Sequence, residues 1–522
     1  MTFFQWFVFF LFVQVIHFAG TWKLYKKAGQ QPWAAIIPIY NAIVLMKIIN
    51  RPKWWVILLF IPIVNLIMIP VIWVETIRSF GRHTTLETWL VVLSLGLYIY
   101  YVNYALKVTY IEDRDLKPQS AVGDWISAIL FAVVAATIVH TYFIQPFTIP
   151  TSSMENSLLV GDFLFVSKLN YGARAPETMV AAPMIHDTLP LVHTKSYLNR
   201  PKLPYFRIPG FESIKHNDIV VFNWPVDTVP YFGYHGPKSY TKPIDKKSHY
   251  VKRAIGIPGD SLSIKDGQVY LNHKALAFPD RAKPQTSYEV KSKGGGFSPS
   301  YLYKHYDYTE PLYRNQNGNF VFQSLTEENA KKLSANPNVA SIEKIIAPKG
   351  ENGHVFPLGK RPEWNADNYG PIYIPKKGAT TKLTEENLPF YKRIIEVYEG
   401  SEIDQPQKIT LKDHQIYLNG KPIDSYTFKL DYYWMMGDNR HNSEDSRYWG
   451  YVPETHIVGK PIFIWLSIDK YGTGLSKFRW ERMFTTVRGD GKTTSYLPHF
   501  LIGLVIIIGV SFFTKNRRKK RS

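Results

Sequence analysis

The stretch HYVKRAIGIPGDSLSIKDGQVYLNHKAL, residues 249–276, decides the fold class of the larger part of this chain. Short runs of β-branched and aromatic residues alternate in it with Gly, Pro, Asn and Asp, the pattern of strands joined by tight turns. FLFVSKLNYG (163–172) and DIVVFNWP (218–225) continue this pattern upstream. The sequence therefore predicts a mainly β domain.

A weak internal repeat extends the prediction. DGQVYLNHKAL (266–276) and DHQIYLNGKPI (413–423) each place Asn with His or Gly between alternating strands, so both are expected to be hairpins. The β domain is accordingly assigned to residues 147–276 and 413–490, and the polar, Lys- and Tyr-rich segment 277–412 to an inserted subdomain. TEENAKKLSA and TEENLP, beginning at Thr326 and Thr384, predict helices capped by those threonines.

Long apolar runs at the two ends of the chain indicate a membrane protein. Four are near the length that spans a bilayer, about 20 residues, and a fifth is shorter but lacks charge. Any one run could instead be a buried core helix. The first could also be a cleavable signal peptide, although residues 1–3 and 17–19 supply the usual basic start and small-residue exit poorly. A Pro-broken segment at 34–49 is expected to be re-entrant or interfacial. The five predicted spans cover residues 2–20, 54–74, 88–106, 125–144 and 500–513.

These runs predict a division of the chain. Residues 1–122 form a polytopic membrane unit of about three spans, 123–146 a transmembrane anchor and 497–514 a C-terminal transmembrane helix. The basic segments KLYKK (23–27) and KNRRKKRS (515–522) are expected to be cytoplasmic. Alternation from these ends puts the N-terminus and the region from 147 to 495 on the far side of the membrane. It also puts Arg78 and Arg82 on an outer loop, against the positive-inside rule.

Composition excludes several classes of function. The chain has 522 residues and a net charge of +20, but its basic residues are dispersed and the sharpest cluster adjoins a span. Anionic lipid is therefore the expected partner of that cluster, and nucleic acid is not. The absence of cysteine excludes thiol nucleophiles and thiolate metal sites. No His-Glu-x-x-His, phosphate-loop or Gly-x-Ser-x-Gly motif occurs, so no metal or cofactor is expected.

Three ordered blocks carry polar residues suited to catalysis: PTSSMENSLLVGDF (150–163), YVKRAIGIPGD (250–260) and MGDNRHNSEDSRYWGYVPE (436–454). Their combination resembles the bacterial type I signal peptidase, the leader peptidase of the serine–lysine class, over residues 125–480. The resemblance implies a β catalytic domain held by transmembrane helices in the bacterial inner membrane and exposed on its extracytoplasmic side. It also implies an endopeptidase that removes signal peptides from exported preproteins without a cofactor.

The resemblance assigns roles position by position. It implies that Ser153, rather than Ser152, is the nucleophile, that Lys252 is the general base, and that Thr151 supplies a hydroxyl to the oxyanion. Asn156 stands where the family usually has proline. Ser443 would orient the lysine. The remaining supporting residues are Arg253, Asp438, Asp445 and Arg447.

Elementary chemistry agrees with this assignment. A lysine can take a proton from a serine hydroxyl only when it is neutral, which requires burial to lower its pKa from about 10.4 towards 7 or 8. The neighbours Val251, Ala254, Ile255 and Ile257 suit that desolvation. The alternatives are a solvated strand lysine and a serine that caps a loop.

The segment FTIPTSSM (147–154) is expected to be an extended edge strand that pairs with the substrate backbone. Shallow pockets would then select the small-x-small residues that precede signal-peptide cleavage sites. The secretion translocon is a further candidate partner. One alternative function is a non-catalytic membrane assembly with an exported β binding module; another, a self-cleaving repressor, would need a DNA-binding module. The substrate-binding residues are expected to be Phe147, Ile149, Met154, Tyr250 and Val251.

Overall fold

A computed structural model describes residues 3–118, 120–192, 194–229, 240–351, 353–359, 361–487, 491 and 493–519. The chain divides into two compact units. The helical unit comprises Met1–Tyr142, Arg174–Arg207 and Val229–Lys246. The β unit comprises Phe143–Ala173, Ile208–Thr228 and Lys247–Ser522.

Among the described residues of the helical unit, two helices are long and apolar enough to cross a membrane, as predicted for the first and fourth runs. These are α1 (Phe3–Lys27) and α7 (Ala121–Tyr142). The runs predicted as spans at 54–74 and 88–106 are not continuous helices. They are divided into α3 (Trp55–Leu58) with α4 (Val64–Arg78), and α5 (Thr85–Leu93) with α6 (Tyr98–Tyr104), the latter pair bent by 116°.

Local backbone chemistry explains these breaks. Ile63, directly after Pro62, has a φ of 70°, and Ile39, directly after Pro38, has a φ of 67°. Helix α2 (Tyr40–Ile48) begins only after that second turn, so the segment at 34–49 is broken at its proline as predicted. Leu95 and Gly96 separate α5 from α6, also at positive φ. Hydropathy alone does not detect such turns, because their residues are as apolar as the helices they join.

A buried carboxylate ties several connections of the helical unit together. Glu75, near the end of α4, pairs with Arg51 at 2.9 Å and lies 3.9 Å from Arg78. Arg114, in the segment before α7, pairs with the same carboxylate. The connection after α2, the end of α4 and the segment after α6 therefore lie at one end of this unit.

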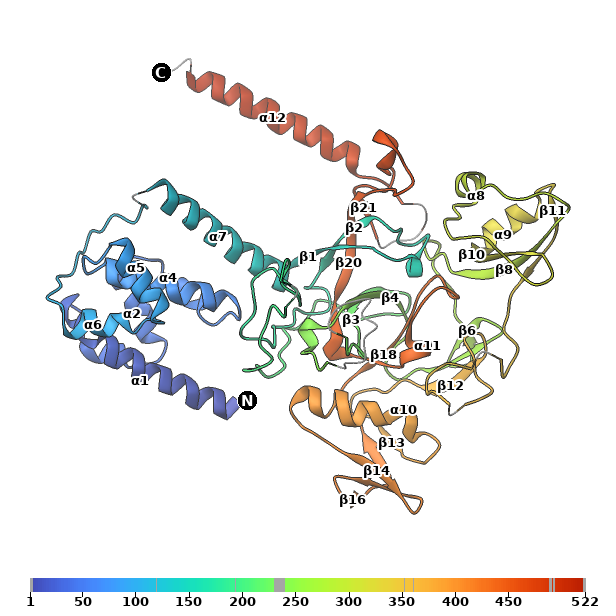
Figure 1. The fold of residues 1–522 in the computed structure, drawn as a ribbon, viewed down its shortest axis with the longest axis horizontal. Coiled ribbons are helices and arrows are strands. Elements are labelled where there is room, and N and C mark those ends of the chain that lie inside the picture. The colour runs from blue at the N-terminus through green and yellow to red at the C-terminus, as the bar shows by residue number, and fades with distance from the viewer. Residues whose placement is uncertain are drawn as a thin grey trace. The chain divides into compact units, whose positions relative to one another are not determined.

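The β unit is built on an antiparallel sheet, which confirms the mainly β prediction. Figure 1 shows its strands, and β1 is an edge. Strand β21 (Thr485–Thr486) pairs with β20. The strand order is β1 (Ile144–Thr148), β2 (Asp162–Ser167), β20 (Ile457–Ser467), β3 (Ile219–Asn223), β4 (His249–Gly256), β18 (Tyr432–Met436) and β19 (Val452–Pro453).

Both predicted hairpins are present. Strands β6 (Gln268–Leu271) and β7 (Lys274–Ala275) join through Asn272 and His273, with φ values of 50° and 68°. Strands β15 (Gln415–Leu418) and β16 (Lys421–Pro422) join through Asn419 and Gly420, at 51° and 80°. Two positive φ values in a two-residue turn are the hairpin geometry that Asn and Gly favour. Strand β5 (Ser261–Lys265) precedes the first hairpin and β14 (Ile409–Lys412) the second.

Residues 285–344 contain a separate four-stranded sheet with its own apolar core. Its helices α8 (Pro299–Tyr306) and α9 (Glu327–Ser334) lie beside it in Figure 1. The hydroxyl of Thr326 accepts from the backbone N–H of Asn329 at 3.1 Å, so the predicted cap of α9 is confirmed. The sheet order is β11 (Val339–Lys344), β8 (Gln285–Ser292), β10 (Phe320–Thr326) and β9 (Tyr313–Arg314).

Later parts of segment 277–412 join other layers of the β unit. Strand β12 (Tyr369–Tyr373) pairs with β5, and β13 (Thr380–Lys382) pairs with β17 (Ser425–Thr427). The prediction that Thr384 caps a helix was wrong, because α10 (Leu388–Arg393) begins four residues later. Thr384 and Asn387 instead bond each other's backbone N–H groups before the helix starts.

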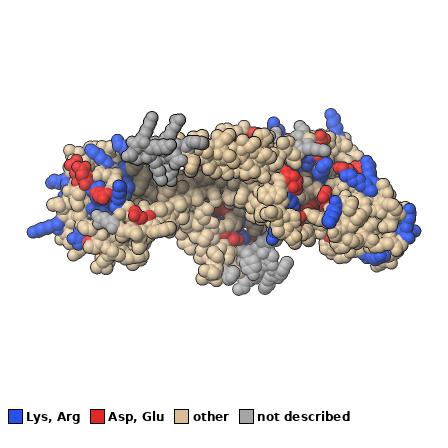
Figure 2. All heavy atoms as spheres, turned by 90° about the horizontal axis from the view of Figure 1, so that it is seen from above, with Lys and Arg blue, Asp and Glu red and all other residues tan. Residues whose placement is uncertain are grey.

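The C-terminal helix α12 (Leu497–Lys519) has an apolar part, Leu497–Phe512, that is shorter than α1 or α7. The predicted basic tail 515–522 lies outside the residues whose side chains are described. On the face shown in Figure 2, Lys and Arg side chains stand among Asp and Glu side chains, and broad areas carry neither.

Candidate active site

Ser153 lies in a short 3₁₀ turn, Ser152–Met154, between strands β1 and β2. Pro150 fixes an extended approach to this turn, and the apolar side chains around it hold it in place. Ile149, Met154 and Leu158 are buried in one cluster with residues of β2, β3 and β20. Ser153 itself is only 8% exposed. The local sequence therefore places a hydroxyl on a rigid turn at the end of an edge strand.

Lys252, on β4, meets this serine directly. Its Nζ donates a hydrogen bond to Ser153 Oγ at 2.6 Å, although the two residues are 99 positions apart. The lysine is 4% exposed. Desolvation by burial lowers the pKa of Lys252 to about 8, although the carboxylates of Asp445 and Glu444 oppose this shift. A useful fraction of the amine is therefore neutral near physiological pH, as catalysis by a lysine base requires.

The loop after β18 packs against the serine turn. The backbone N–H of Asn439 donates to the carbonyl of Ser153 at 3.1 Å, and the Asn439 amide donates to the carbonyl of Ser152 at 3.2 Å. Gly437 sits so close that an added Cβ would lie 2.2 Å from Ser443 Oγ and 2.6 Å from the Ser153 carbonyl oxygen. Glycine is required at position 437 because no side chain fits between these groups.

Ser443, predicted to orient the lysine, is buried beside Gly437. Within the described part of the chain its hydroxyl has no hydrogen-bond partner, and the hydrogen bond from Lys252 goes to Ser153. The structure thus brings Ser443 to the site without the predicted contact to Lys252. An orienting role for Ser443 stays a prediction.

Two buried ion pairs hold the surrounding loops. Arg253 donates to both carboxylate oxygens of Asp438, at 2.7 and 2.6 Å. Arg447 grips Asp445 in the same way, at 2.9 Å to each oxygen, and Asp445 also accepts from the backbone N–H of Gly437 at 3.0 Å. Burial opposes ionisation of both carboxylates, but the facing guanidinium groups hold the pKa of each below its usual value. All four predicted supporting residues therefore fix the loop that carries Gly437.

Thr151, the predicted oxyanion donor, is exposed and extended, with φ of −129° and ψ of 156°. Asn156, at the position where the resemblance implies a proline, has a φ of 62°. Proline cannot adopt a positive φ, whereas Asn tolerates it. The departure from the family pattern therefore matches the local backbone.

The predicted substrate-binding residues are largely brought together. Phe147, Ile149, Met154 and Val251 share one apolar cluster beside the serine turn. Tyr250 packs in a second cluster and stacks on Trp224 at 5.2 Å. The Lys252 ammonium lies 5.3 Å from the centroid of the Tyr250 ring.

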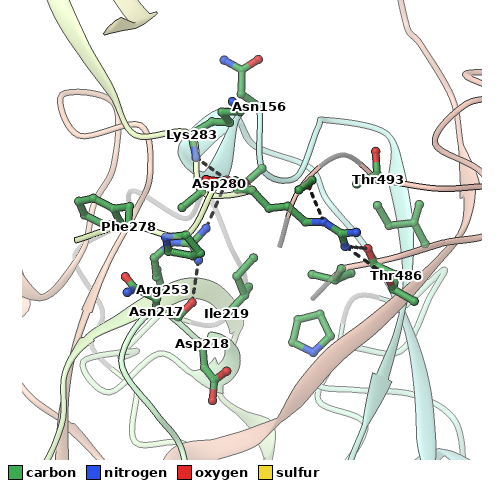
Figure 3. Close-up of a pocket in the computed structure, with 18 of the residues that line it drawn as sticks. Asn156, Asn217, Asp218, Ile219, Arg253, Phe278, Asp280, Lys283, Thr486 and Thr493 are labelled. Atoms are coloured by element: carbon green, nitrogen blue, oxygen red, sulfur yellow. Dashed lines mark hydrogen bonds between the residues drawn. The ribbon is translucent and has the colours of Figure 1, made fainter. Parts of the chain in front are cut away.

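A cavity of about 970 Å³ lies on the other side of β4. Lys252 and Arg253 are adjacent on this strand, so their side chains point to opposite faces. Figure 3 shows Arg253 lining the cavity, where it donates to the carbonyl of Asn217 at 2.7 Å. Neither Ser153 nor Lys252 lines this cavity, so it is distinct from the serine–lysine pair.

Several further residues contact the site or its neighbours, and their roles were not predicted because their partners are distant in the sequence. Asn442 donates to Ser152 Oγ and to Glu310 Oε1, both at 3.1 Å. His441 accepts from the backbone N–H of Ser287 at 3.0 Å and bonds Asp367 at 2.9 Å. His441 and Asn442 lie inside a quoted block, but nothing in the sequence indicates partners 74 to 290 positions away.

Backbone hydrogen bonds also link the four-stranded sheet to this loop. The N–H of Gln285, the first residue of β8, donates to the carbonyl of Asp438 at 2.8 Å. The N–H of Arg440 donates back to the carbonyl of Gln285 at 2.9 Å. Gln285 thus forms a one-residue bridge with the loop that packs on Ser153.

Comparison with known proteins agrees with this geometry. A family of unknown function matches residues 33–113, within the helical unit. Signal peptidase I of Haemophilus influenzae is 24% identical over 390 residues, which cover 72% of this chain and 79% of the relative. Signal peptidase I of Helicobacter pylori strain J99 is 25% identical over 381 residues, covering 70% and 92%. Signal peptidase I of the Acyrthosiphon pisum subspecies of Buchnera aphidicola is 25% identical over 337 residues, covering 65% and 73%.

The family described as "Signal peptidase, peptidase S26" matches residues 122–363 and 424–466. These residues make up more than half of the chain and include Ser153, Lys252 and the loop after β18. The chain belongs to the signal peptidase family, peptidase S26.

Proposed function

We propose that this protein is a membrane-bound serine endopeptidase that removes signal peptides from exported preproteins, with Ser153 as nucleophile and Lys252 as general base. The observation that carries the proposal is the buried hydrogen bond of 2.6 Å between Lys252 Nζ and Ser153 Oγ. A hydroxyl becomes an effective nucleophile only when an adjacent base removes its proton.

The reaction then proceeds in two steps, formation of an acyl-enzyme and its hydrolysis. Neutral Lys252 takes the proton of Ser153 as Oγ attacks the scissile carbonyl, and the resulting ammonium returns the proton to the leaving amine. This yields an ester between the serine and the signal peptide. Water, deprotonated by the same lysine, attacks the ester carbonyl and breaks its bond to Oγ. The lysine returns the proton to Ser153 Oγ, and the signal peptide leaves with a free carboxylate. The Ser153 backbone N–H and the Thr151 hydroxyl would stabilise the oxyanion in both steps.

The edge position of β1 supports an extended mode of substrate binding. Its partner β2 occupies one side, so the other side can accept a peptide strand. Ile149 and Met154 are already buried against the core, which leaves little depth for a substrate side chain next to them. A shallow apolar surface favours small residues and fits the small-x-small pattern of signal-peptide cleavage sites.

The helical unit supports a membrane topology that differs from simple alternation of spans. The ion pairs of Glu75 gather Arg51, Arg78 and Arg114 at one end, and basic residues favour the cytoplasmic side. Segments 28–50, 55–78 and 85–104 would then enter the membrane from the cytoplasmic side and return to it. Within the helical unit, α1 and α7 would cross the membrane. This topology puts Arg78 and Arg82 in the cytoplasm. It keeps the N-terminus and the β unit outside.

Domain boundaries and binding partners of the chain can be proposed as well. We assign residues 285–344 to an inserted subdomain and the rest of the β unit up to Thr486 to the catalytic domain. The basic segment at 515–522 would bind anionic lipid after a C-terminal span. The secretion translocon stays a candidate partner of the helical unit.

Activity is tested with a preprotein that carries an Ala-x-Ala site, using full-length protein purified in detergent. Wild type and Ser152→Ala should cleave at the Ala-x-Ala boundary, whereas Ser153→Ala and Lys252→Ala should lose cleavage by at least about a thousandfold. Equal cleavage by all four proteins would refute the assignment of the serine and the lysine. Absence of cleavage by folded wild-type protein would favour a non-catalytic binding module instead.

Topology is tested by thiol labelling, for which the cysteine-free chain is a ready background. A His83→Cys variant should resist a membrane-impermeant maleimide in spheroplasts and react after lysis. Asn317→Cys, in the β unit, is the control and should react in intact spheroplasts. Labelling of His83→Cys before lysis would contradict this topology and support the one in which successive spans alternate.

A further inference from the structure

Glu310, between α8 and β9, reaches the nucleophile turn from a distant part of the chain. Its Oε1 accepts a hydrogen bond of 3.1 Å from the Asn442 side-chain amide, and that amide also donates to Ser152 Oγ at 3.1 Å. Ser152 directly precedes Ser153. The Asn442 amide thus links the Glu310 carboxylate to the turn that carries the nucleophile through two hydrogen bonds.

The position of Glu310 is fixed by neighbouring contacts. The hydroxyl of Tyr471 donates to the carbonyl of Thr309 at 3.3 Å, and the hydroxyl of Tyr303 bonds the Asp469 carboxylate. These contacts join the segment that carries Glu310 to the loop after β20. Since the chain just before Glu310 is held at both Tyr303 and Thr309, the position of its carboxylate is restricted.

Glu310 lacks a cation of its own. Among the described residues no Lys, Arg or His nitrogen lies within ion-pairing distance of its carboxylate, although the whole chain carries a net charge of +20. The nearby Arg479 and Arg482 pair with Asp469 and Asp162, at 3.6 and 2.6 Å. The Glu310 side chain is half-buried, so water screens its charge only in part.

A second carboxyl group lies close by. Glu155, two residues after Ser153, is 5% exposed, and its Oε2 has no hydrogen-bond partner in the described structure. Burial raises the pKa of Glu155 to about 7, and the charge of Glu310 contributes to the rise. A cation next to this pair would reduce the repulsion between the two carboxylates. It could also donate a hydrogen bond to Glu155 Oε2.

An extended substrate whose signal-peptide residues lie beside 147–151 passes Ser153 and continues away from β1. In this binding mode, the residues that follow the cleavage point would lie near Asn442 and Glu310, which are linked to Ser152 beside the nucleophile. We propose that Glu310 determines specificity for the start of the mature protein, favouring a lysine or arginine and disfavouring an acidic residue there. This inference rests on the proposed cleavage of preproteins.

The test compares substrates that share one Ala-x-Ala signal peptide and differ only in the first two mature residues, which are both Ala, both Lys or both Glu. Wild type should cleave the Lys substrate with a kcat/KM about three- to tenfold above that for the Glu substrate, as expected of a partly screened ion pair. Glu310→Gln should remove most of this preference and leave cleavage of the Ala substrate within about twofold. Glu343→Gln changes an exposed acidic residue of strand β11 and should retain the preference.

Three results would overturn the proposal: no preference in wild type, an unchanged preference in Glu310→Gln, or a uniform loss on all three substrates. The last would make Glu310 a positioning residue for Asn442 and Ser152. The preference should also weaken with added salt.

Binding of the same three peptides to full-length Ser153→Ala, measured by fluorescence anisotropy, separates this inference from the proposed function. Lys-over-Glu selectivity in Kd that depends on Glu310 would support the specificity even if no preprotein were cleaved. Equal Kd values for the Lys and Glu peptides would refute it even in an active enzyme.

Discussion

The pH dependence of cleavage should report the titration of Lys252 directly. Burial lowers the pKa of Lys252 to about 8. About one tenth of the lysine is then neutral at pH 7 and about nine tenths at pH 9. Because only the neutral amine can accept the Ser153 proton, kcat/KM should rise about tenfold between these values and level off above pH 9.

The assay is the initial rate of cleavage of a peptide without groups that titrate between pH 6 and 10, at substrate concentrations well below KM. Under these conditions kcat/KM reports groups of the free enzyme. A Glu444→Gln variant provides an internal check, because the Glu444 carboxylate raises the pKa of Lys252. Since Glu444 is exposed, its loss should move the midpoint to lower pH by only about 0.2 to 0.7 unit.

Three outcomes would contradict this reasoning. A rate that still climbs tenfold per unit above pH 9.5 would mean that Lys252 keeps an ordinary pKa and is not desolvated. A flat profile from pH 6 to 9 would mean that no group with a pKa near 8 limits the reaction. A midpoint that moves to higher pH in Glu444→Gln would contradict the electrostatic explanation of the shift.

Stability measurements test the packing around the site. Gly437→Ala should lower the free energy of unfolding by about 1–3 kcal/mol and cleavage by at least about tenfold, because the new methyl group would meet Ser443 Oγ at 2.2 Å. Asp438→Asn should cost about 3–5 kcal/mol, because it leaves the buried Arg253 guanidinium without a counter-ion. Lys252→Met should be about 1–3 kcal/mol more stable than wild type at pH 6. This advantage should shrink between pH 8 and 10.5, because there the wild-type lysine increasingly folds in its neutral form.

Thermal unfolding in detergent, followed by circular dichroism, measures all three. Gly296→Ala is the control for the first, because an added Cβ at that position meets no atom within 4 Å and stability should not change. A fully active and stable Gly437→Ala variant would contradict the close approach of the two loops. If Lys252→Met gained stability equally at pH 6 and pH 10, the effect would come from packing and not from the lysine charge.

The parts of this structure that depend on neighbouring residues could be predicted from the sequence. Asn272 with His273, and Asn419 with Gly420, specify hairpin turns by their own tolerance of positive φ. Thr326 likewise specifies the start of α9. Such signals act within a few residues and do not depend on the rest of the fold.

The breaks within the membrane segments could not be predicted from hydropathy. Hydropathy measures how apolar a run is but carries no information on direction. The turn at Ile63 therefore escaped notice inside an apolar stretch that was predicted to be one span. Proline was a usable signal there, whereas the bend after Leu93 had only Gly96 to mark it.

In the candidate site, too, some residues could be predicted from the sequence and others could not. Ser153 and Lys252 could be predicted because their motifs are ordered along the chain and resemble a known family. Glu310 could not, because its link to Asn442 spans 132 positions and neither residue carries a distinctive motif. Contacts of this kind are determined by how two loops pack, which a single sequence does not state.

The one-residue bridge at Gln285 has a consequence for shortened forms of the enzyme. This residue closes two backbone hydrogen bonds with the loop that packs on the nucleophile, yet it also begins the sheet of the inserted subdomain. Excision of the subdomain from position 285 onward would leave the N–H of Arg440 and the carbonyl of Asp438 without their partners. A minimal enzyme should therefore keep Gln285 and join the chain beyond it, so that the truncation boundary follows hydrogen bonds and not the domain outline.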